Sequence, residues 1–274
     1  MKCVVVIGYN RPRYFEKVVE SLEKNPESQN LPFFFFLDGG PESRQAEYNE
    51  IIEKHKFPLR TIINRDRNLG CGLNIINARE HVFDRLGFDA AMIFEDDMIV
   101  SPQYIGLGFR LLRQFPDACV QGWSKCIQTR EWKMERLGQV STGKCHFWGY
   151  ALGKATWDRI SPILKEYRSK FLVGPYNQRN SEGIRKWFGT LVENPPHATG
   201  QDAATETALQ AQGIKRIVTI VNRGKYIGEE GIHQKARIFK RMGFDQVNLD
   251  VFPEDREIKE FYFGNKSDIK LEKK

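Results

Sequence analysis

The sequence predicts an α/β fold in which a mostly parallel sheet is flanked by helices, followed by a less regular second half. Three observations support this class. Short apolar segments alternate with helical periodicity through the first half, which is typical of βαβ units. Hydrophobic residues make up 41% and charged residues 28% of the 274 residues, as in ordinary globular chains. No apolar run approaches the roughly 20 residues of a membrane-spanning helix.

The first half begins with a buried strand, because residues 2–8 are apolar and rich in valine. Pro12 then favours the start of a helix, and residues 14–24 carry apolar side chains at helical spacing. The alternation continues with strands at 31–37, 59–64 and 90–94 and with helices at 45–55 and 73–86. Parallel strands bring the polar residues that follow them to one edge of the sheet, where ligands bind in such folds.

The second half is less regular along the chain. Its predicted helices are 104–114, 156–167 and 202–212, and its predicted strands are 118–123, 147–152 and 215–221. Residues 169–200 are rich in Gly, Pro and Asn with weak periodicity, so a long loop or insertion is expected there. The tail after residue 236 mixes charged and aromatic residues, and this pattern predicts neither a helix nor a strand.

The charge and cysteine content bear on the class of partner and on the cellular compartment of the protein. The net charge is +7, and residues 125–200 contain 13 basic and six acidic residues, which accounts for the whole excess. Such a stretch favours an anionic partner or is simply a solvated basic face. Five cysteines without a C-x-x-C pair argue against a disulfide framework or zinc ribbon, and no signal peptide is visible. These features favour a cytoplasmic protein, with peripheral membrane contact left open.

Three polar clusters follow predicted strands and should converge at one sheet edge. Asn10 and Arg11 follow the first strand, Asp38 follows the second, and Glu95-Asp96-Asp97 follows the fourth. Three consecutive carboxylates repel one another unless a cation or donors offset their charge. Hard divalent ions such as Mn²⁺ or Mg²⁺ take carboxylates together with substrate phosphates. The acidic cluster therefore predicts a metal site. The alternative is an acidic turn that only caps the segment following it.

A glycine-rich turn precedes the helix at 73–86. Asn68 and Gly70 stand at its start, and glycines there allow a ligand to approach the backbone closely. The turn matches neither the glycine pattern of dinucleotide-binding folds nor a phosphate-binding P-loop. By itself it is therefore only weak evidence for a ligand site.

The order of these motifs resembles glycosyltransferases of the GT-A fold, which carry an acidic metal motif after the fourth strand. The closer resemblance is to the alpha-mannosyl glycoprotein N-acetylglucosaminyltransferase family, whose metal motif reads Glu-Asp-Asp before an apolar residue, like residues 95–98. Other shared segments are Gln121-Gly122-Trp123, Trp148-Gly149-Tyr150 and Gly228-Glu229-Glu230-Gly231, with His233 shortly after. The resemblance implies a GT-A-like Rossmann-type sheet and inverting transfer of a sugar, N-acetylglucosamine from UDP-GlcNAc by preference.

The resemblance also implies roles for individual residues. Asp97 would bind the metal directly, and His233 could add a ligand. The donor would contact Asn10, Arg11, Asp38, Asn68, Gly70, Glu95, Asp96 and Trp148. Asp202 stands where the family places its catalytic base, and Glu206, one helical turn later, is the alternative. An inverting transfer needs one base for the acceptor hydroxyl and an electrophile for the leaving diphosphate.

These assignments divide the chain into a catalytic domain at 1–235 and a tail at 236–274. Within the domain, residues 1–123 would bind the nucleotide sugar and 124–235 the saccharide acceptor, which is anionic or lipid-linked if the basic stretch faces it. A nucleotidyltransferase is the enzyme alternative, but its glycine-rich basic loop after the first strand is absent. A basic nucleic-acid-binding module ranks third, because no nucleic-acid-binding signature is present, and no nucleic-acid partner is expected.

Overall fold

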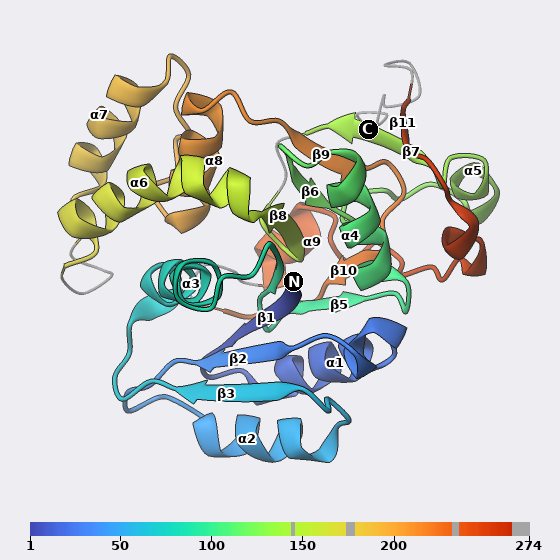
Figure 1. The fold of residues 1–274 in the computed structure, drawn as a ribbon, viewed down its shortest axis with the longest axis horizontal. Coiled ribbons are helices and arrows are strands. Elements are labelled where there is room, and N and C mark those ends of the chain that lie inside the picture. The colour runs from blue at the N-terminus through green and yellow to red at the C-terminus, as the bar shows by residue number, and fades with distance from the viewer. Residues whose placement is uncertain (144–145, 174–178, 232–235, 265–274) are drawn as a thin grey trace.

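The computed structural model describes residues 1–143, 146–173, 179–231 and 236–264, and it shows the predicted α/β architecture (Figure 1). The strands are β1 (Lys2–Gly8), β2 (Phe33–Leu37), β3 (Arg60–Asn64), β4 (Ala90–Phe94), β5 (Met98–Val100), β6 (Cys119–Gln121), β7 (Gln139–Thr142), β8 (Tyr150–Gly153), β9 (Arg216–Thr219), β10 (Gly224–Tyr226) and β11 (Tyr262–Phe263). The α-helices are α1 (Pro12–Glu23), α2 (Gln45–Lys54), α3 (Gly70–Glu80), α4 (Tyr104–Gln114), α5 (Arg130–Met134), α6 (Lys154–Phe171), α7 (Ser181–Leu191), α8 (Gln201–Ala211) and α9 (Ala236–Arg241).

Nine of the described strands form one sheet in the order β11-β7-β9-β6-β8-β4-β1-β2-β3, and β5 pairs separately with β10. The β4-β1-β2-β3 half is parallel, whereas β8 runs antiparallel between β4 and β6. Gly8 lies beside Leu37, and Val6 lies beside Phe94. The carboxyl ends of β1, β2 and β4 therefore meet at one edge, as the sequence predicts.

Alternate side chains of the central strands enter two separate cores. Val4 and Val6 of β1 face a cluster that includes buried residues of α1, α2 and α4. Cys3 and Val5 face the opposite cluster, which includes buried residues of α3, α6, α7 and α8. Because both faces of the sheet are covered, its central strands read as continuous apolar runs rather than alternating ones. The last three of those helices gather together at the upper left of Figure 1.

The expectation of a loop over residues 169–200 is wrong. Helix α6 extends to Phe171, and α7 occupies Ser181–Leu191 with Ile184 and Phe188 buried against the second core. Those two residues have the i, i+4 spacing of a helix face. The glycines and prolines that flank this short helix concealed its periodicity in the sequence.

Several elements were not predicted at all: β5, β7, β10, β11, α5 and α9. Each spans only two to six residues, which is too short to show a period. The helix predicted at 73–86 instead begins at Gly70, and after Glu80 it continues as a π-helical turn over His81–Arg85.

The described part of the tail packs against the rest of the chain. Strand β11 pairs in parallel with β7 at the edge of the large sheet. Arg223, which precedes β10, forms an ion pair with Asp255 at 2.6 Å, and both side chains are fully buried. A 3₁₀ turn over Pro253–Glu257 carries Asp255 into this position.

Candidate active site

Arg11 joins the turn after β1 to the acidic turn after β4. Its Nη2 donates to Asp96 Oδ1, and its Nη1 lies 2.8 Å from Asp97 Oδ2. The Tyr48 hydroxyl of α2 donates to Asp96 Oδ2 at 2.8 Å and accepts from the Arg11 backbone N–H at 2.8 Å. One arginine and one tyrosine thus offset part of the charge of two buried aspartates.

The electrostatics of this cluster follow from burial and charge together. Burial by itself would lower the pKa of Arg11, but Asp96 and Asp97 more than offset it, so its pKa is raised and it stays charged. Burial raises the pKa of Asp97 to about 6, although Arg11 favours its ionised form. The carboxylate of Asp97 therefore gains from any further cation at this position.

The oxygens of the cluster are unequally occupied. Both oxygens of Asp96 accept hydrogen bonds, from Arg11 and Tyr48. In contrast, Asp97 Oδ1 is buried without a partner among the described residues. No set of three His, Cys, Asp or Glu side chains in the described part of the chain is arranged to hold a metal. The donor set fits a divalent ion held by Asp97 and completed by substrate phosphates, since Mg²⁺ commonly uses one or two carboxylates in this way.

Asp38 anchors the glycine-rich turn to the same edge. Its Oδ1 accepts the N–H of Leu69 at 2.8 Å and of Gly39 at 3.0 Å, and its Oδ2 accepts the N–H of Gly70 at 2.8 Å. Burial raises its pKa despite these hydrogen bonds. Asn68 accepts from Gly70 N–H at 2.7 Å and donates to the Tyr9 hydroxyl at 2.9 Å. The structure therefore brings Asp38, Asn68 and Gly70 into one hydrogen-bonded unit beside the turn that holds Asn10 and Arg11.

Two carboxylates from distant segments, Glu95 and Asp202, lie close enough for their charges to interact. Glu95 follows β4, and Asp202 lies in the first turn of α8. Burial, and next the charge of Asp202, raises the pKa of Glu95 well above its ordinary value. Burial also raises the pKa of Asp202, against the opposing effects of Arg79 and Arg216. The Cys71 thiol donates to Glu95 Oε2 at 3.8 Å.

Glu206 has a different environment from Asp202, although both lie on one face of α8. Its carboxylate pairs with Arg216 at 2.8 Å and accepts from Gln210 at 2.9 Å. No cation of the described residues lies within ion-pair distance of Asp202, whose Oδ1 accepts from the Gln201 side chain. The charge of Glu206 is therefore offset by Arg216. The raised pKa of Asp202, in contrast, means that its carboxylate binds a proton more readily than an ordinary aspartate.

Trp148 lies in a stack of rings rather than at an open surface. Its ring stacks on Tyr226 at a centroid distance of 3.8 Å and on His146 at 4.2 Å. The residue is only 8% exposed, and both faces of its ring are covered. The expected contact of Trp148 with a sugar would have to use the ring edge. His233, the other expected ligand, lies outside the described residues.

Sequence reasoning missed four side chains of this site: Tyr48, Tyr226, Arg79 and Cys71. Tyr48 lies among the buried apolar residues of α2, and Tyr226 neighbours Asp97, whose charge adds to burial in raising the tyrosine pKa. Arg79 is fully buried and donates to the Tyr150 hydroxyl and to Thr205 Oγ1. A lone arginine on the apolar face of a helix was the available signal, because a buried arginine needs partners.

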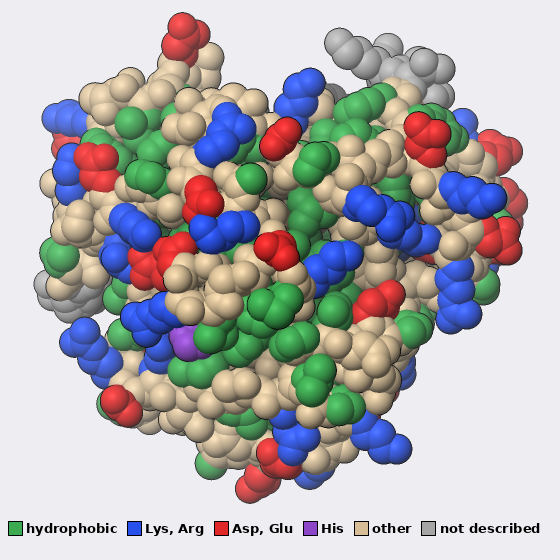
Figure 2. Space-filling model, viewed as in Figure 1, with side chains coloured by type: hydrophobic (Ala, Val, Ile, Leu, Met, Phe, Trp, Pro, Cys, Tyr) green, Lys and Arg blue, Asp and Glu red, His purple; other side chains and the backbone are tan. Residues whose placement is uncertain are grey.

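The surface of the basic stretch is largely paired. Figure 2 shows Lys and Arg side chains interspersed with Asp and Glu on this face rather than forming one continuous patch. Within residues 125–200, the ion pairs are Lys133–Asp250, Arg136–Glu135, Lys154–Asp158, Lys165–Asp84, Arg168–Glu80, Lys170–Glu166 and Lys186–Glu182. Four of these carboxylates belong to the stretch itself, so only Asp250, Asp84 and Glu80 from outside it offset its excess of positive charge, and they do so in part.

Similarity to known proteins extends over most of the chain. Residues 3–186 match the family described as Glycosyl transferase family 2. Among solved structures, the chain is similar to the crystal structure of S. aureus TarS 1-349, with a TM-score of 0.49 and 11% sequence identity, over 84% of this chain and 61% of that one. No curated protein sequence matches significantly. The family match contains Arg11, Asp38 and Asp97 but ends before Asp202, so the assignment of a base depends on geometry.

Proposed function

Since the chain belongs to glycosyl transferase family 2, we propose that it transfers a sugar from a nucleotide-diphosphate donor to a saccharide hydroxyl, with inversion at the anomeric carbon. The observation that carries this proposal is the meeting of Arg11, the Asp96–Asp97 pair and Asp202 at the carboxyl edge of the sheet. That edge is where α/β sheets bind ligands. The donor we propose is UDP-GlcNAc, on the resemblance alone.

The donor diphosphate would lie between Arg11 and Asp97. A divalent ion, Mn²⁺ or Mg²⁺, would be held by Asp97 Oδ1 and would supply the Lewis acidity that stabilises a leaving diphosphate. Arg11 would donate to the phosphates from the other side, since its guanidinium already faces this position and remains charged. Asn10, Asp38, Asn68, Gly70, Glu95 and Asp96 would shape the donor pocket around them.

Asp202 is our candidate for the general base. A base needs a carboxylate that is free to accept a proton and has a raised pKa, because proton affinity rises with pKa. Asp202 has a raised pKa and forms no ion pair with a described residue, although its Oδ1 accepts from Gln201, whereas Glu206 is already paired with Arg216. The roles of Trp148 and His233 as ligand contacts remain proposals from the resemblance.

The acceptor would be a saccharide or glycan, with the anionic or lipid-linked form as the alternative that a salt titration tests. None of the described helices is both long and apolar enough to cross a bilayer. A cytoplasmic location with peripheral membrane contact is our proposal. The sugar-phosphate nucleotidyltransferase alternative receives no support from the family match.

The test is a screen of purified protein against nucleotide sugars, with release of the nucleoside diphosphate as the readout. Each donor is assayed with Mn²⁺, with Mg²⁺ and with a chelator. We expect release from one donor class with metal and little with chelator. Release of pyrophosphate from a nucleoside triphosphate and a sugar phosphate would instead identify a nucleotidyltransferase. Full activity in chelator would exclude the metal role of Asp97.

A further inference from the structure

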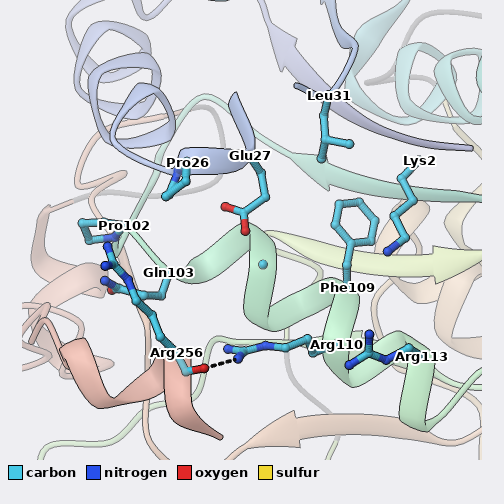
Figure 3. Close-up of a pocket in the computed structure, with 11 residues that line it drawn as sticks. Lys2, Pro26, Glu27, Leu31, Pro102, Gln103, Phe109, Arg110, Arg113 and Arg256 are labelled. Carbon is cyan, nitrogen blue, oxygen red and sulfur yellow. Dashed lines mark hydrogen bonds between the residues drawn. The ribbon is translucent and has the colours of Figure 1, made fainter. Parts of the chain in front are cut away.

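A cavity lies at the opposite edge of the sheet from the candidate active site. Its volume is about 320 Å³, and Figure 3 shows side chains from the start of β1, the turn after α1, and α4 around it. Lys2 lines this cavity at the first residue of β1, whereas Arg11 follows the last residue, Gly8. Seven strand residues span about 20 Å at roughly 3.3 Å each. The cavity is therefore separate from the catalytic edge.

Positive charge dominates the lining of the cavity. Lys2, Arg110, Arg113 and Arg256 contribute four cations, and Glu27 is the one carboxylate among its lining residues. None of these five side chains forms an ion pair with another described residue. This differs from the basic stretch 125–200, where most cations are neutralised. Unpaired cations around a concave site attract an anion.

Arg110 has a different task from the other three cations. Its guanidinium donates to the backbone carbonyls of Asp255 at 2.6 Å and Arg256 at 3.1 Å. It thereby fixes the 3₁₀ turn that brings Arg256 to the rim. Lys2, Arg113 and Arg256 are exposed and make no such contacts, so they remain available to a ligand.

The wall also carries oxygen acceptors that lack donors. Gln103 is only 8% exposed, and its Oε1 has no hydrogen-bond partner in the described part of the chain. Glu27 Oε2 is likewise buried without a partner among those residues. A buried polar atom without a partner costs free energy. Ligand hydroxyls are the donors that would satisfy such acceptors.

We propose that this cavity binds a phosphorylated sugar or polyol as a site distinct from the catalytic one. The phosphate would be held by Lys2 and Arg113, and the hydroxyls would face Glu27, Gln103 and the Arg256 guanidinium, which lies beside Gln103 (Figure 3). Phe109 supplies an apolar wall for the carbon skeleton, and Lys2 Nζ lies 5.1 Å from its ring centroid. The volume lies at the small end of the usual range for ligand sites, which suits one sugar ring with its phosphate.

The test measures binding of glucose 6-phosphate by calorimetry, with glucose as the uncharged control and inorganic phosphate as the control without a sugar. The test variant replaces Arg113 and Arg256 together by Gln. Both side chains are exposed and without ion pairs in the described structure, so the fold should be unaffected. The matched control replaces Arg185 and Arg241, two exposed arginines elsewhere, and lowers the net charge equally.

We expect wild type and the control variant to bind glucose 6-phosphate alike, and the test variant to bind about tenfold or more weakly, because two charge-assisted hydrogen bonds are lost. Glucose should not bind, and Asp97→Ala should leave binding unchanged. No binding by wild type, or equal loss in the control, would overturn the proposal. Binding that UDP competes away would assign the ligand to the catalytic edge instead. Equal affinity for inorganic phosphate would reject the sugar ester as the ligand class.

Discussion

At the scale of single residues, our proposal of a metal-assisted reaction depends on Asp97. Its Oδ1 is the oxygen of the acidic turn that the described residues leave unpaired, while Arg11 holds Oδ2. Asp96 next to it is fully engaged by Arg11 and Tyr48. We therefore propose separate roles for the two adjacent aspartates: Asp96 holds Arg11 in place, and Asp97 would bind the metal through Oδ1.

Replacing Asp97 by Ala should lower metal-dependent transfer by about 100-fold or more, because metal stabilisation of the leaving group is worth several kcal/mol. The thermal unfolding midpoint should not fall, since one of two neighbouring buried negative charges is removed. Steady-state assays and Mn²⁺ binding by calorimetry check both points. Asp117→Ala, an exposed aspartate, is the control. Unchanged Mn²⁺ affinity in the Asp97 variant would contradict its role as a ligand.

Replacing Asp202 by Asn should lower kcat about 100-fold or more and leave donor affinity almost unchanged, because the amide cannot accept a proton. A base acts only when ionised. Since the pKa of Asp202 is raised by burial, activity should fall with decreasing pH at a higher pH than for an ordinary aspartate. The pH profile of kcat/KM in the wild type shows this acidic limb. A collapse of donor affinity in the variant would instead make Asp202 a donor or structural residue.

At the scale of elements, the active edge is built by turns that approach one another closely. A Cβ on Gly39 would lie 2.2 Å from the carbonyl oxygen of Arg65, and one on Gly40, whose φ is +99°, would lie 3.0 Å from Asn68 Cβ. The turn after β2 therefore packs its backbone directly against the segment that leads into α3. Asp38 can reach the N–H groups of Leu69 and Gly70 only because of this close packing.

Gly39→Ala should therefore destabilise the protein by about 1–3 kcal/mol, because overpacking against backbone forces a shift. It should also weaken donor binding, since the turn after β3 moves with it. Gly189→Ala in α7 is the matched control, because its new methyl group would have no described atom within 4 Å beyond the backbone of its own helix. That substitution should be neutral or stabilising by up to about 1 kcal/mol. Urea unfolding measures both, and equal effects would contradict the packing argument.

The tail is joined to the sheet by the buried pair Arg223–Asp255. Asp255→Ala should destabilise the protein by about 3–5 kcal/mol, because it leaves a buried charge without its partner. Cleavage by protease within residues 245–264 should accelerate as well. Asp245→Ala, at an exposed position of the same tail, should change neither. A small effect of Asp255→Ala would mean that water or another group compensates Arg223.

At the scale of the whole molecule, basic residues that have few acidic neighbours along the sequence still find carboxylates to pair with in the folded structure. Lys165, Arg168 and Lys170 belong to the stretch that holds the net positive charge, yet each pairs with a carboxylate from its own or a neighbouring helix. Such pairs have little remaining attraction for a distant anion. Four cations that form no ion pair with another described residue line the cavity at the opposite edge of the sheet: Lys2, Arg110, Arg113 and Arg256.

We therefore expect the KM for the acceptor to change by less than about threefold between about 0.05 and 0.5 M salt. Replacing Lys165, Arg168 and Lys170 together by Gln should have a similarly small effect on that KM. Initial-rate kinetics with varied acceptor measure both. A steep salt response that the triple variant abolishes would favour an anionic or lipid-linked acceptor.

The sequence by itself determined the strand and helix alternation of the first half and the convergence of Arg11, Asp38 and Asp97. It could do so because buried parallel strands are continuous apolar runs and because their polar ends must share one edge. Short elements such as β5 and β10 carried too few residues for a pattern, and the glycines and prolines around α7 concealed its helical spacing.

Only the tertiary structure decided which of these groups interact. It paired Glu206 with Arg216 and left Asp202 without an ion-pair partner among the described residues. It also covered both faces of Trp148 and brought Arg113 and Arg256 into the lining of one cavity. The physical reason is that ion pairing, ring stacking and pKa depend on distances between side chains far apart in sequence. Periodicity fixes which face a residue occupies, but the packing of whole elements fixes its partners.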